Sequence, residues 1–188
     1  MFYDQEVEKN QKKSRNVNSL PRWVQTWLLF SSVVCILDAL FVLLRPDTLP
    51  KGKFDSPIWK PWHIYINIDH RYNDMTDPFV IAQSWMNIAE VFLNIIAILI
   101  SLISKPICNL LAFAASLMTL WKTVLYLSLY IVTPQGAVNY HGHNNSTTKL
   151  LMFWGPNAVW IFIPFTIVLL LGGRIGNCAK SEKHLKEY

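Results

Sequence analysis

The stretch "QSWMNIAEVFLN", residues 83–94, lies in the middle of a long apolar block. Its polar residues recur at steps of four, three and four: Gln83, Asn87, Glu90 and Asn94. In an α-helix these steps place all four side chains on one face. Because a carboxyl group and three amides are costly at the depth of lipid tails, the stripe predicts a helix that faces polar partners inside a bundle.

The composition around this stretch is that of a membrane protein. Of the 188 residues, 52% are hydrophobic and only 15% are charged, whereas a soluble domain carries roughly a quarter charged residues. The net charge of +5 suits tails that rest near anionic lipid. No motif indicates nucleic-acid binding, so we expect the membrane as a partner and no nucleic acid.

Four apolar blocks are long enough to cross a bilayer, which needs about 20 apolar residues. They cover approximately residues 23–44, 79–103, 108–132 and 149–172. Proline or charged residues bound each block, as at Asp77-Pro78. We therefore predict an all-α membrane protein built as a four-transmembrane-helix bundle.

The bundle domain, residues 23–174, is expected between a polar tail at 1–22 and a basic tail at 175–188. Basic residues near helix ends favour the cytosol, and four crossings return both tails to the same side. We therefore expect a multi-pass protein with both termini cytosolic and a lumenal loop at 45–78. No short apolar core with a cleavage site precedes the first block, so we expect its helix to act as its own insertion signal.

The other three blocks also carry polar residues near mid-depth. Asp38 lies on the first, Lys122 on the third, and Asn157 and Trp160 one turn apart on the fourth. On the third block, Ser116, Thr119, Tyr126 and either Lys122 or Thr123 form a second polar face. An ionisable residue near the bilayer centre costs roughly 2.5–3.5 kcal/mol, so we expect these groups to meet in a buried polar pocket.

A structural interpretation of the same residues stays open. Glu90 and Lys122 would then form an ion pair that fixes helix packing, with amides bonding across helices at about 0.6 kcal/mol each. Two carboxyl groups and one lysine nevertheless leave one acid, Asp38 or Glu90, without a counter-ion. Such a group would donate a proton or hold a cationic group of a ligand.

The loop between the first two blocks is rich in aromatic residues: "PIWKPWHIYINIDHRYNDMTDPF". A structureless loop of about 30 residues is unusual, so we expect it to form a cap with short elements of its own. Its motif W-x-x-Y-x-x-x-D-x-R-Y consists of Trp62, Tyr65, Asp69, Arg71 and Tyr72. We expect Asp69 and Arg71 to pair, and the aromatic side chains to lie at the membrane interface.

This spacing resembles the emopamil-binding proteins, which are sterol Δ8-Δ7 isomerases, and the wider EXPERA superfamily that includes the sigma-two receptor. Similar stretches are "WKTVLY" at 121–126, "FWGPNAVWIFIP" at 153–164, "LDALFVLLRP" at 37–46 and "DPFVIAQSW" at 77–85. The resemblance covers about residues 25–175 and places Asp77 at the entry to the second helix.

The resemblance implies a domain of the endoplasmic reticulum with a lipid-accessible cavity for sterols or amphipathic amines. In the isomerases, an acid protonates a ring alkene, an adjacent carbon loses a proton, and aromatic groups stabilise the cation between these steps. By resemblance Asn157 and Trp160 match the family's asparagine and tryptophan, and Asp38 matches its first-helix acid. A tryptophan face would contribute about 2 kcal/mol or more beside a desolvated cation.

The chain departs from the isomerases at several of their functional positions. Val34 stands where they have a histidine, and Ser84 rather than Glu90 falls where they have a second-helix glutamate. Lys122 and Thr123 replace a glycine and an aspartate. Catalysis is therefore an alternative to binding and not the leading expectation.

We expect a membrane protein of the endoplasmic reticulum that binds a sterol or a related amphipathic lipid or amine, with no cofactor and no metal. The alternatives are a sterol isomerase with Asp38 and Glu90 as acid and base, and a non-catalytic assembly or trafficking factor; a homodimer stays open. The candidate ligand-binding residues are Asn87, Trp121, Lys122, Tyr126, Asn157 and Trp160. The structural motif comprises Trp62, Tyr65, Asp69, Arg71, Tyr72 and Asp77.

Overall fold

The computed structural model describes residues 19–132, 138–141 and 144–186, and within these ranges the chain is helical with no strand. Four helices are long and apolar enough to cross a membrane, which confirms the predicted all-α membrane protein. They are α2 (Arg22–Leu43), α4 (Pro78–Leu102), α5 (Ile107–Ile131) and α7 (Gly155–Lys186), the last preceded by α6 (Ser146–Lys149) and the π-helical η3 (Leu150–Trp154).

The first three helices begin and end one residue before the predicted blocks. The fourth runs longer than predicted, because the helix continues beyond 174 to Lys186 where a tail was expected. Of the expected N-terminal tail, residues 1–18 lie outside the described residues.

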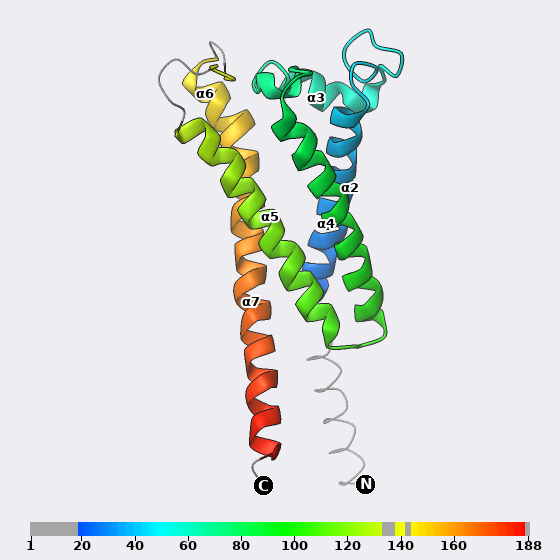
Figure 1. Ribbon diagram of the computed structural model, residues 1–188, viewed down its shortest axis with the longest axis vertical. Coiled ribbons are helices and arrows are strands. Elements are labelled where there is room, and N and C mark those ends of the chain that lie inside the picture. Colours follow the sequence, from blue (N-terminus) through cyan, green and yellow to red (C-terminus); the bar gives the residue numbers. More distant parts are fainter. Residues whose placement is uncertain (1–18, 133–137, 142–143, 187–188) are drawn as a thin grey trace.

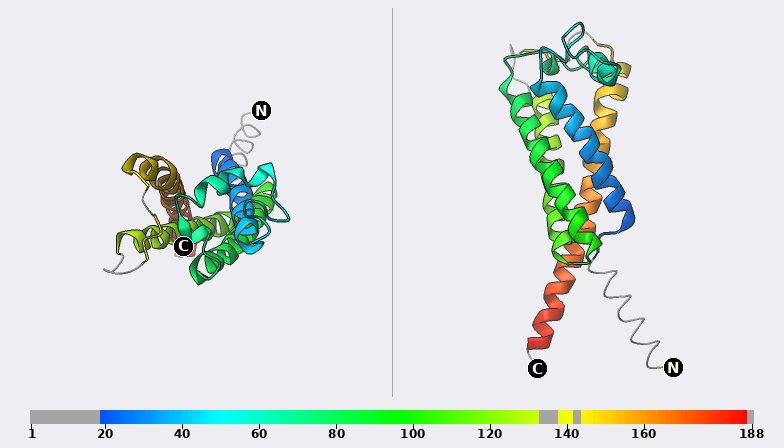
Figure 2. Two further views of the ribbon diagram at one scale, coloured as in Figure 1. Left: turned by 90° about the horizontal axis from the view of Figure 1, so that it is seen from above. Right: turned by 90° about the vertical axis from the view of Figure 1, so that its right-hand side faces the viewer.

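The four long helices form a bundle in which α2 packs against α4, α4 against α5, and α5 against α7 (Figure 1). The start of α2 and the end of α7 lie toward one end of the molecule, and the segment between α2 and α4 lies at the other (Figure 2). The two ends of the described chain therefore share a side, as an even number of crossings requires.

Two hydrophobic clusters hold the bundle together. The first joins all four long helices near the start of α2, through Val24, Leu28, Ala97, Ala112 and Ile167. The second joins the bundle to the segment between α2 and α4, and includes Phe41, Trp59, Tyr72, Tyr126 and Phe153. Along α4 and α5, the buried polar residues Asn87, Glu90 and Lys122 lie between residues of the two clusters.

The segment between α2 and α4, residues 44–77, forms a cap over this end of the bundle (Figure 2). It contains three short helices: η1 (Pro57–Trp59), α3 (Lys60–Tyr65) and η2 (His70–Tyr72). The guanidinium of Arg45 anchors its far end by donating to the carbonyls of Arg71 (3.3 Å), Tyr72 (2.8 Å) and Asp74 (3.1 Å). One cation thus satisfies three backbone acceptors that a loop would otherwise leave to solvent.

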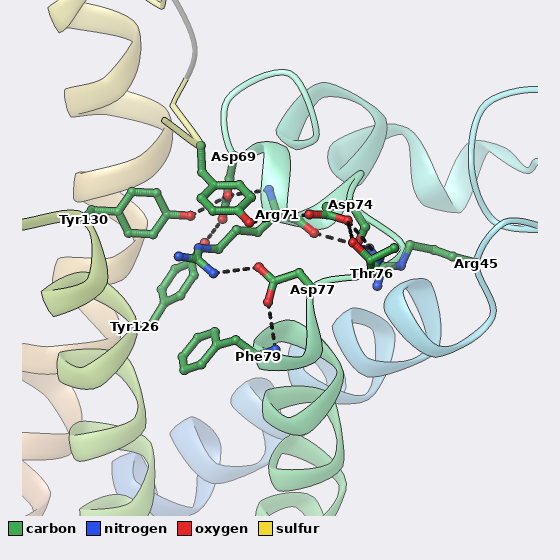
Figure 3. A network of polar contacts seen from close by, with 10 residues as sticks. Arg45, Asp69, Arg71, Asp74, Thr76, Asp77, Phe79, Tyr126 and Tyr130 are labelled. Carbon is green, nitrogen blue, oxygen red and sulfur yellow. Dashed lines mark hydrogen bonds and ion pairs between the residues drawn. The ribbon is translucent and has the colours of Figure 1, made fainter. Parts of the chain in front are cut away.

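The cap ends in the Asp77-Pro78 pair that starts α4. The Asp77 Oδ1 atom accepts from the backbone N–H of Phe79 at 2.8 Å, and proline suits the first helical position because it has no N–H to satisfy. The guanidinium of Arg71 donates to Asp77 Oδ2 at 2.6 Å (Figure 3). The expected side-chain pair of Arg71 with Asp69 is therefore wrong. Only the Arg71 backbone N–H binds Asp69, at 3.0 Å, because Asp69 caps η2 and its carboxyl group turns toward α5.

Candidate functional site

A cavity of about 340 Å³ lies inside the bundle, beneath the cap. Each of the four long helices and the cap contributes to its wall. Its lining residues are Val34, Cys35 and Asp38 from α2, Gln83 and Asn87 from α4, Lys122, Thr123 and Tyr126 from α5, Pro156, Asn157 and Trp160 from α7, and Pro61, Trp62, Tyr65 and Tyr72 from the cap. Two of the lining residues, Pro61 of α3 and Pro156 at the start of α7, are exposed.

Asp38 is the acid that faces this cavity. Its carboxylate accepts from the indole N–H of Trp62 at 2.9 Å, from the amide of Asn87 at 3.0 Å and from the hydroxyl of Tyr72 at 3.3 Å. All three partners act as donors, which matches an ionised carboxylate because that group only accepts. Since two of the donors belong to the cap, Asp38 also fastens the cap to α2.

Lys122 pairs with Glu90, which resolves the choice that the sequence leaves open. Its ammonium group donates to Glu90 Oε2 at 2.7 Å and to the amide oxygen of Asn87, and the Lys122 and Glu90 side chains are 6% and 1% exposed. Asn87 therefore links the two acids, because its nitrogen donates to Asp38 and its oxygen accepts from Lys122. Glu90 itself does not line the cavity, whereas Lys122 and Asn87 do.

The polar stripe of α4 faces the interior of the bundle. Asn87, Glu90 and Asn94 are 4%, 1% and 1% exposed, and the Asn94 amide donates to the Ser32 hydroxyl of α2 at 3.2 Å. Gln83 lines the cavity, and its buried Oε1 atom has no hydrogen-bond partner among the described residues. The stripe thus forms the polar contact between α4 and its neighbours.

Most of the sequence-predicted ligand residues meet at this cavity, and Trp121 does not. Trp121 is 63% exposed on the outer side of α5, because adjacent residues of a helix point about 100° apart and Lys122 points inward. Sequence reasoning missed Val34, Pro61 and Pro156, which are apolar and carry no signal that separates a cavity wall from a packed core. The predicted residues that do line the cavity are Asp38, Asn87, Lys122, Tyr126, Asn157 and Trp160, together with Trp62, Tyr65 and Tyr72 of the loop motif.

Asp69 forms a second buried polar group where the cap meets α5. It accepts from the hydroxyl of Tyr126, from the hydroxyl of Tyr130 at 2.5 Å and from the Arg71 backbone N–H at 3.0 Å (Figure 3). Burial raises the pKa of Asp69 even though these hydrogen bonds favour its charged form. Tyr130 was missed, although it follows Tyr126 by four residues on the same helical face, a spacing that would have indicated it.

The α2–α7 side of the cavity is held by aromatic contacts. The ring of Trp160 meets that of Trp27 edge-on with centroids 5.3 Å apart, and Phe30 lies 6.1 Å from Trp160. These contacts place Trp160 in the wall of the same cavity as Asp38. Within the described ranges, no group of three histidine, cysteine or acidic residues is placed to hold a metal ion.

The charges around the cavity favour a cationic or hydrogen-bond-donating guest. With both acids and the lysine ionised, Asp38 is left unneutralised once Lys122 has paired with Glu90. A partly buried carboxylate attracts a cation more strongly than it would in bulk water.

No family model matches the chain, and no curated protein and no solved structure is detectably similar to it. The resemblance to the EXPERA superfamily therefore rests on the motif residues of the sequence alone. What the protein does has to follow from the cavity and its carboxylate.

Proposed function

We propose that this chain binds an amphipathic ligand, a sterol or a related lipid or amine, in the cavity between its membrane helices. The observation that carries the proposal is an intramembrane cavity of about 340 Å³ with the Asp38 carboxylate on its wall. The motif resemblance supports an EXPERA-type protein of the endoplasmic reticulum. The basic residues near the helix ends support cytosolic termini and a lumenal cap.

The form of the cavity supports binding. Small-molecule sites are typically concave, roughly 300–1,000 Å³, and mostly apolar with a few fixed polar groups. Here Asp38 is already held by Trp62, Tyr72 and Asn87 before any ligand arrives. A ligand therefore loses little affinity to reorganisation of the protein.

Sterol isomerisation is the second candidate, and one observation favours it: Asp38 and Trp160 line the same cavity. A double-bond shift needs a proton donor and a proton acceptor. Glu90 is bound to Lys122 and does not line the cavity. Asp38 would then have to serve both steps. Expression in a yeast that lacks its own Δ8-Δ7 isomerase tests this candidate: restored sterols that are lost with Asp38→Asn would establish it, and an unchanged sterol profile would exclude it.

An assembly or trafficking factor would use the polar residues for helix packing only. The Glu90–Lys122 pair fits this role, because both side chains are buried and Glu90 does not line the cavity. Helix packing alone does not require a cavity beside the Asp38 carboxylate. The cavity therefore makes binding the better-supported proposal.

The binding proposal is tested with the full chain in lipid nanodiscs and a photoreactive sterol. Val34→Trp places a large ring in the cavity and should reduce specific labelling at least about tenfold, whereas Val33→Trp, at a neighbouring position that is 52% exposed, should leave it unchanged. Equal labelling of both variants, or labelling confined to outward-facing residues, would refute an internal site.

A comparison of a cationic ligand with a neutral one separates the role of the Asp38 charge from the role of the cavity's shape. Asp38→Asn should lower affinity for a cationic amphiphile by about tenfold, while affinity for a neutral sterol changes little, because only the cation loses an ionic partner. A parallel loss of both ligands would show that Asp38 acts through the shape of the site and not through its charge.

A further inference from the structure

The cap end of the cavity is lined by two tyrosines that form a chain to Asp69. The hydroxyls of Tyr65 and Tyr126 lie 3.1 Å apart, and Tyr126 donates to the Asp69 carboxylate. Tyr65 and Tyr126 line the cavity, and Asp69 lies beyond its wall. A polar group outside the cavity is therefore connected through two hydroxyls to the ligand space.

Asp69 fixes the direction of this chain. Its carboxylate accepts from Tyr130 and from the Arg71 backbone N–H as well as from Tyr126, and the guanidinium of Arg71 is bound to Asp77. A hydroxyl has one proton to donate. Because Tyr126 gives its proton to Asp69, the hydrogen bond between the two tyrosines has to be donated by Tyr65.

The Tyr65 hydroxyl consequently has no proton left to donate to a ligand in the cavity. Its oxygen has two lone pairs, of which the contact with the Asn157 amide occupies at most one. The Asn157 nitrogen also donates one of its two protons to the carbonyl of Phe153 at 2.8 Å, which leaves one for the contact with Tyr65. At this end, the cavity offers acceptors.

We infer that Tyr65 accepts a hydrogen bond from the ligand, so that the cavity selects a ligand with a hydroxyl at its cap end over the same ligand with a ketone there. This inference rests on the proposed sterol-type binding and deepens it by stating the chemical group that is recognised. A ketone can bind only if the Tyr65 proton turns away from Tyr126, which breaks one hydrogen bond of the chain.

The test compares cholesterol with cholest-5-en-3-one, which differ in a hydroxyl or a ketone at one carbon. Both compete against a photoreactive sterol on the full chain in nanodiscs. We expect cholesterol to compete about fivefold better, the value of one net hydrogen bond. Tyr65→Phe should bring the ratio to about one. Tyr140→Phe is the control: it removes a tyrosine hydroxyl that lies outside the cavity and reaches only Asp74, at 3.5 Å, so it should keep the wild-type ratio.

Asp69→Asn tests the direction of the chain separately from its shape. An asparagine amide can donate to Tyr126, which lets Tyr126 donate to Tyr65 and Tyr65 donate to the ligand. The preference should then fall or invert toward the ketone. A ratio that stays at the wild-type value in both Tyr65→Phe and Asp69→Asn overturns the inference.

Failure of the inference is distinguishable from failure of the proposed function. If both sterols compete equally well with the wild-type chain, or the ketone competes better, the selection by Tyr65 is wrong and the binding site stands. If neither sterol competes, the proposed function is wrong and the inference fails with it.

Discussion

Asn87 has a central role in this protein because it is the contact between two acids with different surroundings. Its amide nitrogen donates to Asp38 on the cavity, and its oxygen accepts from Lys122, which neutralises Glu90. One side chain thus orients the free carboxylate and the buried ion pair together. Asp38 stays available to a ligand because Lys122 is committed elsewhere.

The contribution of the buried Glu90–Lys122 pair to the free energy of unfolding can be measured with a double-mutant cycle. Lys122→Met leaves Glu90 buried without its cation and should destabilise the protein by about 3–5 kcal/mol. Replacing both, as Lys122→Met with Glu90→Leu, should recover most of this loss because no buried charge remains. Unfolding of the purified protein in detergent, followed by heat or denaturant, provides the measurement. A double variant no more stable than Lys122→Met would show that the pair is not coupled.

The ligand preference should depend on pH through Asp69. The hydroxyl-over-ketone preference needs an ionised Asp69, so it is present above the pKa of this group and lost as pH falls through it. Because burial raises the pKa of Asp69, the loss should occur at a higher pH than for an ordinary aspartate. Burial lowers the pKa of the neighbouring His141, so its protonated form is less favoured there than in solution. The titratable and charged groups around Asp69 are Tyr65, Tyr72, Tyr126, Tyr130, Arg71 and His141.

The measurement is the competition ratio of the two sterols across pH 5–8. Asp69→Asn is the matched control, because it cannot titrate and should give a ratio that does not change with pH. If the wild-type ratio is equally independent of pH, Asp69 does not determine the direction in which the Tyr126 hydroxyl donates.

At the scale of elements, the long helices could be predicted and the cap contacts could not. Apolar length determines a membrane span, so α2, α4 and α5 were placed to within one residue. The steps of the α4 stripe likewise predicted its buried face, since helix geometry is fixed. In contrast, Arg71 has two acids within reach, and its choice of Asp77 over Asp69 depends on the turn of η2 and the start of α4.

Asp77 should couple the cap to α4, because one carboxylate caps the helix and holds Arg71. Asp77→Ala removes both contacts and should destabilise the protein by about 1–2 kcal/mol. It should also speed amide exchange in residues 57–77 and in the first turn of α4, as measured by hydrogen–deuterium exchange. Asp74→Ala is the control, since the Asp74 side chain bonds mainly to the exposed Thr76 and should change exchange little. Equal effects of both variants would argue against the coupling.

For the whole molecule, the cavity depends on all four helices and the cap at once, which is why sequence periodicity could indicate polar faces but not the space between them. The helix rotations that bring Asp38, Asn87 and Asn157 to one cavity follow from the packing of two hydrophobic clusters at different depths. The same architecture puts the cap and the end of α7 at opposite ends of the bundle, so we expect them on opposite sides of the membrane if all four helices cross it (Figure 1).

This arrangement gives a test of orientation with the protein's own cysteines. Cys178 near the end of α7 is exposed, whereas Cys35 and Cys108 are buried, so a membrane-impermeant maleimide should react with Cys178 alone. If the termini are cytosolic, the reagent should label Cys178 in sealed microsomes. A cysteine placed in the cap, Asn73→Cys with Cys178→Ser, should react only after the membrane is permeabilised, because Asn73 is exposed on the opposite side. Labelling of Asn73→Cys in sealed microsomes, with Cys178 protected, would invert the proposed orientation, and labelling of both would contradict the four-span arrangement itself.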